Sequence, residues 1–271
     1  MTTCRVFIAA AALLYATASR AQSDTITSDK VITNARMAAI GSADILDTYL
    51  SPEKYKGVEL RYISHTTRDS ERSRWSRRIT HQGSISYADN RSGNGAEMAG
   101  AYFFQYAWLY NWHLSGNRLN LKAGAAADAT IGFIYNTRNG NNPAQARAMV
   151  NITPTGSADY RFTLAGRPFT ARYELNIPLC GLMFSPNYGQ SYYEIFSRGN
   201  YDRNIVPTTF VCSPSVRQML SLDFTIGRTT LRAGYLCDIQ QARVNNLKSH
   251  IYTHAFMIGV VRRFKIIKIH P

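Results

Sequence analysis

Histidine is the first residue type to consider for chemistry in this chain, because imidazole transfers protons and binds metals near neutral pH. His250 and His254 lie four residues apart with Tyr252 between them, so they share one face of a strand. No cysteine or carboxylate joins them at metal-ligand spacing, and Ser64-His65 is an adjacent serine–histidine pair. Phosphate loops and nucleophile elbows are also missing from the sequence. We therefore expect no catalytic residue, no metal and no cofactor.

The cysteines leave two readings open. Cys180, Cys212 and Cys237 follow the N-terminal apolar segment, and an odd number of cysteines does not make a disulfide framework. Cys180 and Cys212 flank one long loop and could pair across it. Three free thiols is the alternative.

Charged residues fall into pairs if two tight turns set the strand register. A turn at Gly227-Arg228 places Asp223 opposite Arg232 and Arg217 opposite Asp238, all on the polar faces of their strands. A slip of one residue would move each of them against an apolar neighbour.

A second turn, at Gly166-Arg167, places Asp159 opposite Glu174 and Arg161 opposite Arg172. The diagonals then join Asp159 to Arg172 and Arg161 to Glu174, within reach of long side chains. The chain has far more arginine than lysine, and arginine suits paired carboxylates in a confined, wet space. We therefore predict a charge network inside a lumen.

The elements that carry these charges alternate with period two, which predicts β-strands. The alternation is clearest between Leu119 and Met183, where three long strands follow each other. In Tyr102–Trp112 one face carries only aromatic residues, as in strands that cross the aromatic girdles of a membrane. The further strand candidates are Val31–Ile40, Val58–Ser64, Ile79–Tyr87, the two strands that flank Gly227-Arg228, and Ile251–Phe264.

These features predict an all-β fold: a single antiparallel transmembrane β-barrel of about ten strands, with eight or twelve also open. Connections alternate between short turns and long loops, the longest being residues 185–214 and a shorter one being Gln241–Ser249. A barrel of this size has an interior mostly filled by side chains, so we expect a plugged or very narrow lumen. A soluble, lipocalin-like barrel would instead turn its apolar face inward.

The expected organisation is a signal peptide over residues 1–21, a flexible lead-in over 22–30, the barrel over 31–264 and a tail over 265–271. We expect the arginine-rich segment Arg68–Arg78 to be solvated and close to the membrane. Pro154 and Pro178 lie nearly opposite each other and predict a bulge or an early end of pairing.

Function is predicted only in outline: a structural or binding barrel, not an enzyme. The alternatives are a lipid- or peptide-hydrolysing enzyme at the barrel rim and a soluble secreted lipid-binding barrel. We expect partners among outer-membrane lipids, including anionic lipopolysaccharide, and the barrel-assembly machinery, but no nucleic acid. The candidate binding residues lie in one outer loop, which could equally fold onto the barrel mouth as a plug: Tyr188, Tyr192, Tyr193 and Phe196.

Four segments carry a family resemblance. Ile45–Gly57 (ILDTYLSPEKYKG), Tyr135–Ala148 (YNTRNGNNPAQARA), Phe184–Asn200 (FSPNYGQSYYEIFSRGN) and Gly234–Phe264 resemble an uncharacterised family of outer-membrane β-barrel proteins from Bacteroidota-type Gram-negative bacteria. The resemblance implies a β-barrel in the outer membrane. It implies no activity, ligand or catalytic residue.

Overall fold

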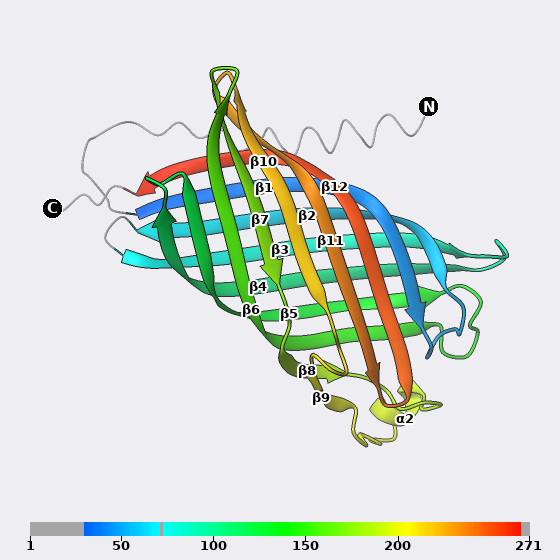
Figure 1. Ribbon diagram of the computed structural model, residues 1–271. Coiled ribbons are helices and arrows are strands. Elements are labelled where there is room, and N and C mark those ends of the chain that lie inside the picture. Colours follow the sequence, from blue (N-terminus) through cyan, green and yellow to red (C-terminus); the bar gives the residue numbers. More distant parts are fainter. Residues whose placement is uncertain (1–29, 71–72, 267–271) are drawn as a thin grey trace.

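Ten antiparallel strands pair in a closed ring, as expected for a single barrel (Figure 1). The structure is a computed structural model that describes residues 30–70 and 73–266. The ring order is β1–β2–β3–β4–β5–β6–β7–β10–β11–β12, and β12 pairs back onto β1. Its strands are β1 (Lys30–Asp47), β2 (Tyr55–Ser70), β3 (Ser73–Asn90), β4 (Ala96–Leu114), β5 (Leu119–Asn136), β6 (Ala144–Leu164), β7 (Arg167–Asn176), β10 (Val216–Ile226), β11 (Thr229–Val244) and β12 (Leu247–Ile266).

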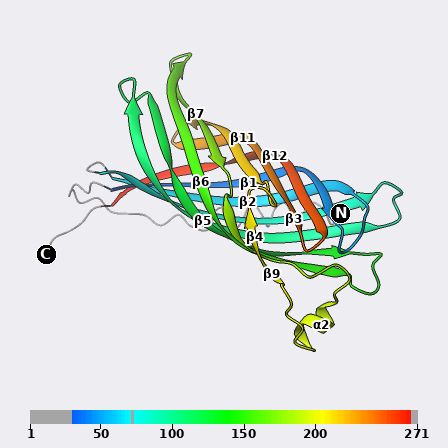
Figure 2. The ribbon, with the colours of Figure 1, turned by 60° about the horizontal axis from the view of Figure 1, so that its bottom comes forward.

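Three further elements lie between β7 and β10. They are β8 (Cys180–Phe184), α2 (Tyr192–Phe196) and β9 (Ile205–Thr209). Figure 2 shows α2 and β9 standing away from the wall, at the end opposite to the end of β12. No helix within the described ranges has the length and hydropathy needed to cross a membrane.

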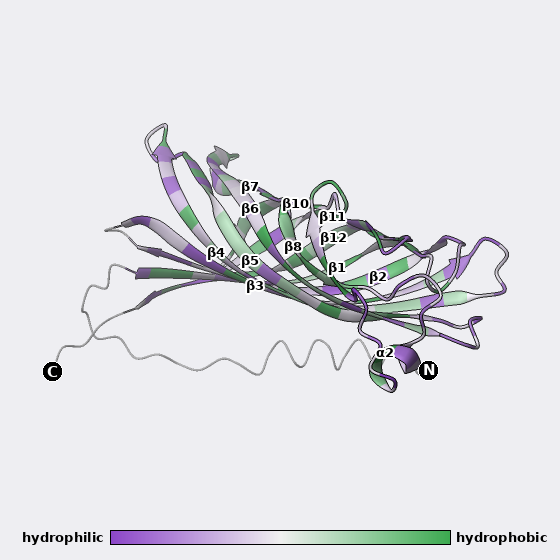
Figure 3. Cartoon of the chain, turned by 90° about the horizontal axis from the view of Figure 1, so that it is seen from below, coloured by the Kyte–Doolittle hydropathy of each residue, from purple (hydrophilic) through white to green (hydrophobic). Residues whose placement is uncertain are grey.

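The wall strands are two-faced, which is why the sequence alternates (Figure 3). On β4 the outward residues include Tyr102, Trp108 and Trp112, which are 47%, 49% and 42% exposed. Their inward neighbours Phe103 and Gln105 are buried. The apolar face therefore points out along the aromatic strand, opposite to the arrangement of a lipocalin-like barrel.

The strands are longer than a membrane crossing needs. β1 has 18 residues, whereas a tilted membrane strand needs about 9–11. On β1 the last apolar residue of the outward row is Ile40, which is 60% exposed. The next outward residues, Ser42 and Asp44, are polar. The end of β1 and the loop that follows it therefore lie beyond the exposed apolar belt.

Extended strands explain two predictions that were wrong. The expected loop Gln241–Ser249 is a two-residue turn, Asn245-Asn246, in which both φ angles are positive. Here β11 has passed the apolar belt, so Arg243 is exposed while Ala242 and Val244 pack inward. Side chains still alternate in this part of β11, but here the inward residues are apolar and the outward residue is polar. A pattern of outward apolar residues therefore does not reveal it.

The segment Arg68–Arg78 is not a solvated linker but the end of β2 and the start of β3. Arg78 is among the most buried side chains of the molecule. The expectation was wrong for Arg78, because strand alternation sends neighbouring residues to opposite faces, whereas Arg68, Arg74 and Arg77 are exposed.

The proline prediction is confirmed. Pairing of β7 with β10 ends at Asn176, and Pro178 separates β7 from β8. Beyond this break β8 continues along β6 and pairs with β9, while β10 starts separately at Val216. The wall above the break is joined by single hydrogen bonds, such as the one from Arg243 N to Cys212 O.

The domain boundaries differ slightly from expectation. β1 begins at Lys30 and β12 ends at Ile266, so the barrel reaches into both expected flanking segments. The expected signal peptide over residues 1–21, and residues 22–29 and 267–271, lie outside the described residues.

Two apolar clusters fill parts of the lumen. One lies on the inner faces of β1, β2, β10, β11 and β12. The other includes the loop after β1 and lies near the opening of the barrel at which β1 ends, which we call the outer mouth. The first contains Ala35, Met37, Ala39, Ile63, Met219, Leu236, Ala255, Met257 and Val261. The second contains Ala43, Ile45, Leu50, Tyr55, Ala88, Ala99, Ile134 and Ile251.

Candidate functional site

Buried ion pairs cross the lumen between the apolar clusters. Asp238 on β11 receives hydrogen bonds from Arg61 on β2 at 2.6 Å and from Gln240 at 2.9 Å. Arg217 on β10 lies 3.0 Å from the same carboxylate oxygen of Asp238. Arg61 also donates to Glu59 at 2.8 Å. This group joins β2 to β10 and β11, which are not its neighbours in the ring, through one carboxylate.

Glu59 extends this group further around the lumen. Its second oxygen accepts hydrogen bonds from Thr253 at 2.9 Å and from Ser86 at 3.3 Å. The guanidinium carbon of Arg217 lies 3.9 Å from the centre of the Phe103 ring, so an aromatic face covers that cation.

A second group centres on Glu174 of β7. Its carboxylate lies 3.3 Å from Arg78 and 3.5 Å from His65, and its other oxygen lies 3.8 Å from Arg172. Arg172 also lies 3.1 Å from Asp159 on β6. Since all five side chains point inward from four strands, they fill the cross-section that β2, β3, β6 and β7 surround.

Two isolated pairs complete the network. Arg232 donates two hydrogen bonds to Asp223, at 2.6 and 2.8 Å, in the fork geometry that suits carboxylates. Lys122 on β5 donates to Asp69 on β2 at 2.7 Å.

The Gly227-Arg228 register is as predicted. The structure pairs Asp223 with Arg232 and Arg217 with Asp238 across β10 and β11. Both pairs come from one hairpin whose two-residue turn fixes its register, which is why the sequence was sufficient.

The register predicted at the other hairpin is wrong by two residues. The turn residues are Ala165 and Gly166, both with positive φ, as a type I′ turn requires. Asp159 therefore lies directly opposite Arg172, not opposite Glu174. Arg161, predicted to join the lumen network, lies opposite Thr170, where its side chain is exposed.

Several members of the network were not assigned to it from the sequence. Glu59 and Arg61 are two positions apart on β2, but Asp238, the second partner of Arg61, lies 177 residues from it. Arg78 and His65 meet Glu174 in the same long-range way. Alternation could show that these side chains point inward, but not which of them meet across the lumen.

The loop between β8 and β9 closes over the outer mouth. Tyr192 of α2 donates to Gln145 of β6 at 2.9 Å and accepts from the Ala146 N–H at 2.7 Å. Its ring packs edge-on against Tyr49 of the β1–β2 loop, with ring centres 5.9 Å apart. Since β6 and β1 lie on opposite sides of the ring, this tyrosine spans the mouth.

Further contacts hold the loop in place. Tyr49 donates its hydroxyl proton to Gln190 O at 2.9 Å, and Asn245 donates to Ser185 O at 3.0 Å. Burial raises the pKa of Tyr49 and of Tyr192 to about 12. Both phenols therefore keep their protons as hydrogen-bond donors.

The four aromatic residues predicted for binding divide into two kinds. Tyr192 belongs to the inner side of the β8–β9 loop, which closes over the outer mouth and which we call the cover. Tyr188, Tyr193 and Phe196 are 74%, 62% and 62% exposed. The guanidinium carbon of Arg198 lies 5.4 Å from the Tyr193 ring centre, and Phe196 stacks on Phe184 and Tyr192. The loop is thus both a cover on its inner side and an aromatic surface on its outer side.

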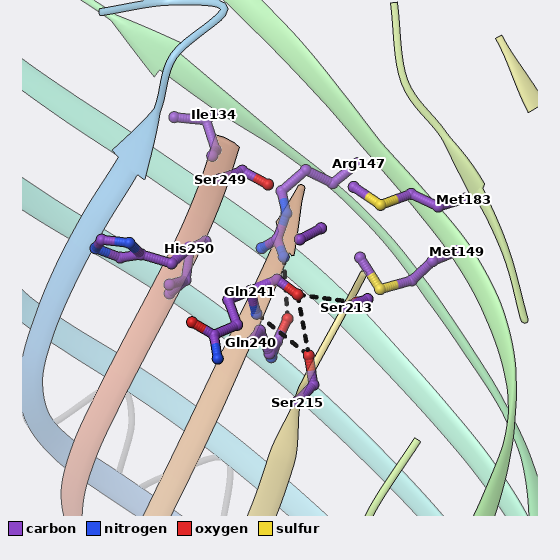
Figure 4. A pocket seen from close by; sticks show the side chains of 12 residues that line it. Ile134, Arg147, Met149, Met183, Ser213, Ser215, Gln240, Gln241, Ser249 and His250 are labelled. Atoms are coloured by element: carbon purple, nitrogen blue, oxygen red, sulfur yellow. Dashed lines mark hydrogen bonds between the residues drawn. The ribbon is translucent and has the colours of Figure 1, made fainter. Parts of the chain in front are cut away.

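Below the cover lies a small pocket, shown in Figure 4. Arg147 and Met149 of β6 line one side, and Ser213, Ser215 and Gln240 line the other. Arg147 donates to Gln240 at 3.0 Å. The cavity volume is about 20 Å³, and a neighbouring pocket beside Arg217 has about 40 Å³. These volumes hold a few water molecules, since one water needs about 10–15 Å³.

The residues considered for catalysis are used elsewhere. Ser64 and His65 are neighbours on a strand and point to opposite faces, so they do not form a nucleophile–base pair. His250 bonds to Asp44 at 3.0 Å and stacks on Tyr252, whereas His254 bonds to the Tyr235 hydroxyl at 2.6 Å. The described residues contain no group of three His, Cys, Asp or Glu side chains suited to a metal.

The proposed disulfide does not form, and Cys180, Cys212 and Cys237 are free thiols. Cys180 is exposed on the outer face of β8. Cys212 is partly buried, packs against an inner cluster around Met183, and accepts a hydrogen bond from Thr209 N at 3.2 Å. The two cysteines face different sides of the hairpin, which is why flanking one loop did not bring them together.

The fold and site define a closed ten-stranded antiparallel β-barrel with a charge-paired interior. The chain belongs to DUF3316, a family described as proteins of unknown function, whose model matches residues 6–271. This membership supports the resemblance to an uncharacterised family; the Bacteroidota origin stays a prediction.

Solved structures similar to the chain are outer-membrane barrels. The translocator domain of the autotransporter NalP from Neisseria meningitidis has 11% identity and a TM-score of 0.42, covering 96% of this chain and 94% of that chain. The transport unit of AIDA-I from Escherichia coli has 8% identity and a TM-score of 0.41, covering 93% and 97%. The COG4313 outer membrane channel from Pseudomonas putida F1 has 9% identity and a TM-score of 0.36, covering 91% and 99%.

A search among curated proteins gave no match. Because the structural likenesses have low identity and TM-scores below 0.5, the assignment of the fold rests on the strand pairing itself.

Proposed function

We propose that the chain is a non-enzymatic outer-membrane barrel with a sealed lumen, which uses its outer loop to bind a glycan, a lipid or a partner protein. The observation that carries this proposal is that apolar and charged side chains have exchanged the places they take in a soluble protein. Large apolar side chains are exposed around the whole wall, while charged groups are buried within it. The exposed row includes Ile40, Leu60, Ile85, Tyr102, Ile131, Val150, Leu220 and Phe256.

The sealed lumen follows from its contents. Two apolar clusters and the two carboxylate-centred groups occupy the interior, and the pockets among them have volumes of about 20–40 Å³. A porin needs a continuous aqueous path, which barrels with many more strands provide. This supports a barrel that acts through its surface and not through conduction.

Orientation follows from the loops. The start of β1, the end of β12 and the two-residue turns Ala165-Gly166 and Gly227-Arg228 lie at one end of the barrel, and the long β8–β9 connection lies at the other. Bacterial barrels have short periplasmic turns and longer outer loops, so the end with the short turns faces the periplasm. The partners we propose are outer-membrane lipids, including lipopolysaccharide around the outer half, and the barrel-assembly machinery, with no nucleic acid.

Two measurements test the proposal together. Membrane fractionation with heat-modifiable gel mobility should recover the chain as a folded barrel in the outer membrane, and recovery as a soluble protein would contradict it. In planar lipid bilayers the folded barrel should show no large, stable conductance. The double variant Arg61→Ala/Arg217→Ala removes two guanidinium groups that cross the lumen and should produce measurable leak events. Large, stable conductance from the unchanged barrel would overturn the sealed-lumen part.

A further inference from the structure

Four arginines are exposed on the outward face of the wall, near the end where β1 starts and β12 ends. They are Arg36 on β1, Arg68 on β2, Arg77 on β3 and Arg262 on β12. Figure 1 shows the corresponding ends of β12, β1, β2 and β3 side by side at the left of the barrel. We call these four residues the arginine patch.

The strand register groups the arginine patch into two close pairs. Arg68 pairs directly with Arg77 across β2 and β3. Arg262 pairs with Asn34, two positions from Arg36 on the same outward row of β1. Residues opposite each other have Cβ atoms about 5 Å apart and diagonal neighbours about 7–8 Å apart, so guanidinium groups can converge from each pair.

The arrangement lacks its own counter-charge. Within the part of the chain that the structure describes, none of the four arginines has an ion-pair partner, and the outward residues around them include no carboxylate. Like charges directly opposite each other on a sheet destabilise it. Arg68 and Arg77 are therefore placed as if an anion from outside the chain lies between them.

The neighbours of the arginine patch point to the source of that anion. Arg77 pairs with Trp108, and Trp75 on the same row is 59% exposed and packs edge-on against Tyr110. Phe264, 53% exposed, follows Arg262 on the outward row of β12. Tryptophan and tyrosine collect where a membrane meets water, so the guanidinium groups lie at the level of lipid headgroups.

We propose that the arginine patch binds the phosphate diester of an anionic phospholipid in the periplasmic leaflet of the outer membrane. The arginine patch lies on the outward face of a wall that also carries apolar and aromatic residues. A lipid therefore reaches it by diffusing within the membrane. Arginine binds phosphate oxygens in a two-point geometry, and clusters of basic residues at a membrane surface retain anionic lipids. The leaflet assignment rests on the orientation given under the proposed function.

Native mass spectrometry of the folded, full-length barrel tests this directly. The barrel is released from detergent micelles doped with phosphatidylglycerol or with the zwitterionic lipid phosphatidylcholine, and retained lipids are counted. The unchanged barrel should retain phosphatidylglycerol selectively, and Arg68→Gln/Arg77→Gln should lower that retention at least fivefold. Arg262→Gln alone should give a smaller loss, because it leaves the directly opposed pair in place.

A matched control is available at the same end of the barrel. Arg118→Gln/Arg228→Gln removes the same charge from two exposed turns outside the arginine patch and should leave retention unchanged. Heat-modifiable mobility confirms that each variant is folded before it is measured.

Three outcomes would overturn the proposal: equal retention by the Arg68/Arg77 variant and the unchanged barrel, equal retention of the two phospholipids, or tighter patch-dependent retention of lipid A than of phosphatidylglycerol. Because the lipids are counted on the purified barrel, this test can fail even when fractionation places the chain in the outer membrane.

Discussion

Asp238 shows what a single residue contributes inside this barrel. It is buried, and one of its oxygens accepts from Arg61 and Gln240 and lies 3.0 Å from Arg217. Arg217 therefore takes its counter-charge from this carboxylate, and Arg61 shares its charge between Asp238 and Glu59. Breaking a buried ion pair by removing one partner leaves an uncompensated charge, which costs more than the pair itself contributes.

Replacing Asp238→Asn should lower the free energy of unfolding by about 3–5 kcal/mol, because the shape is kept while Arg217 loses its counter-charge and Arg61 keeps only Glu59. Chemical unfolding of the refolded barrel in lipid or detergent measures the change. Asp202→Asn is the matched control, since this exposed carboxylate lies 3.9 Å from Arg203 and should give almost no change. A loss below about 1 kcal/mol for Asp238→Asn would contradict the role of this carboxylate.

Asp47 carries a pH dependence at the outer mouth, beyond the apolar belt. Burial raises the pKa of its carboxyl to about 6, and the hydrogen bond from Tyr49 N–H and the charge of Arg147 oppose that shift only in part. A raised folded-state pKa favours the protonated form. The stability it contributes is present below about pH 4 and is lost as the pH rises through about 6.

Asp47→Asn should remove this loss, since the amide keeps an acceptor for Tyr49 N–H and does not titrate. Unfolding midpoints at pH 4 and pH 7 measure the effect. The unchanged barrel should lose up to about 3 kcal/mol more than the variant between these two values, as a shift of about two pKa units implies. Parallel pH profiles for the two proteins would show that Asp47 does not titrate as stated.

At the scale of elements, α2 is held by its own first turn. Ser191 accepts from Glu194 N–H at 3.2 Å, and Glu194 accepts in return from Ser191 N–H at 2.7 Å, which completes a capping box. These bonds also lower the pKa of the Glu194 carboxyl. With only Ile195 buried in this five-residue helix, the cap is a large part of what keeps the cover ordered.

Ser191→Ala should loosen the cover without opening the barrel. An N-cap contributes about 1 kcal/mol, so trypsin cleavage after the exposed residues Arg198 and Arg203 should become about fivefold faster. Ser197→Ala at the other end of α2 is the control. Unchanged cleavage rates, or loss of heat-modifiable mobility, would contradict the local role of the cap.

At the scale of the molecule, alternation predicted the strands, and the alternating loop lengths led to a count of about ten. The aromatic row, the loop lengths and the paired charges together predicted that the polar face points inward. Two-residue turns predicted pairs within one hairpin, and they failed by two residues where Ala165 occupies a left-handed position that glycine usually takes. Contacts across the lumen, such as Arg61 with Asp238, depend on the closure of the ring. No local pattern encodes them, and neither β8, β9 nor the cover could be derived from period two.

The interrupted seam between β7 and β10 sets how the barrel yields to force. The seam between the terminal strands β1 and β12 is paired from Lys30 to Asp47, whereas β10 meets β7 only from Arg217 to Phe224. A load that pulls the wall apart would therefore find its weakest line within the chain and not at the junction of its ends. We therefore expect mechanical rupture of the wall to begin at the short β7–β10 seam, which lies beneath the cover that carries the exposed aromatic surface.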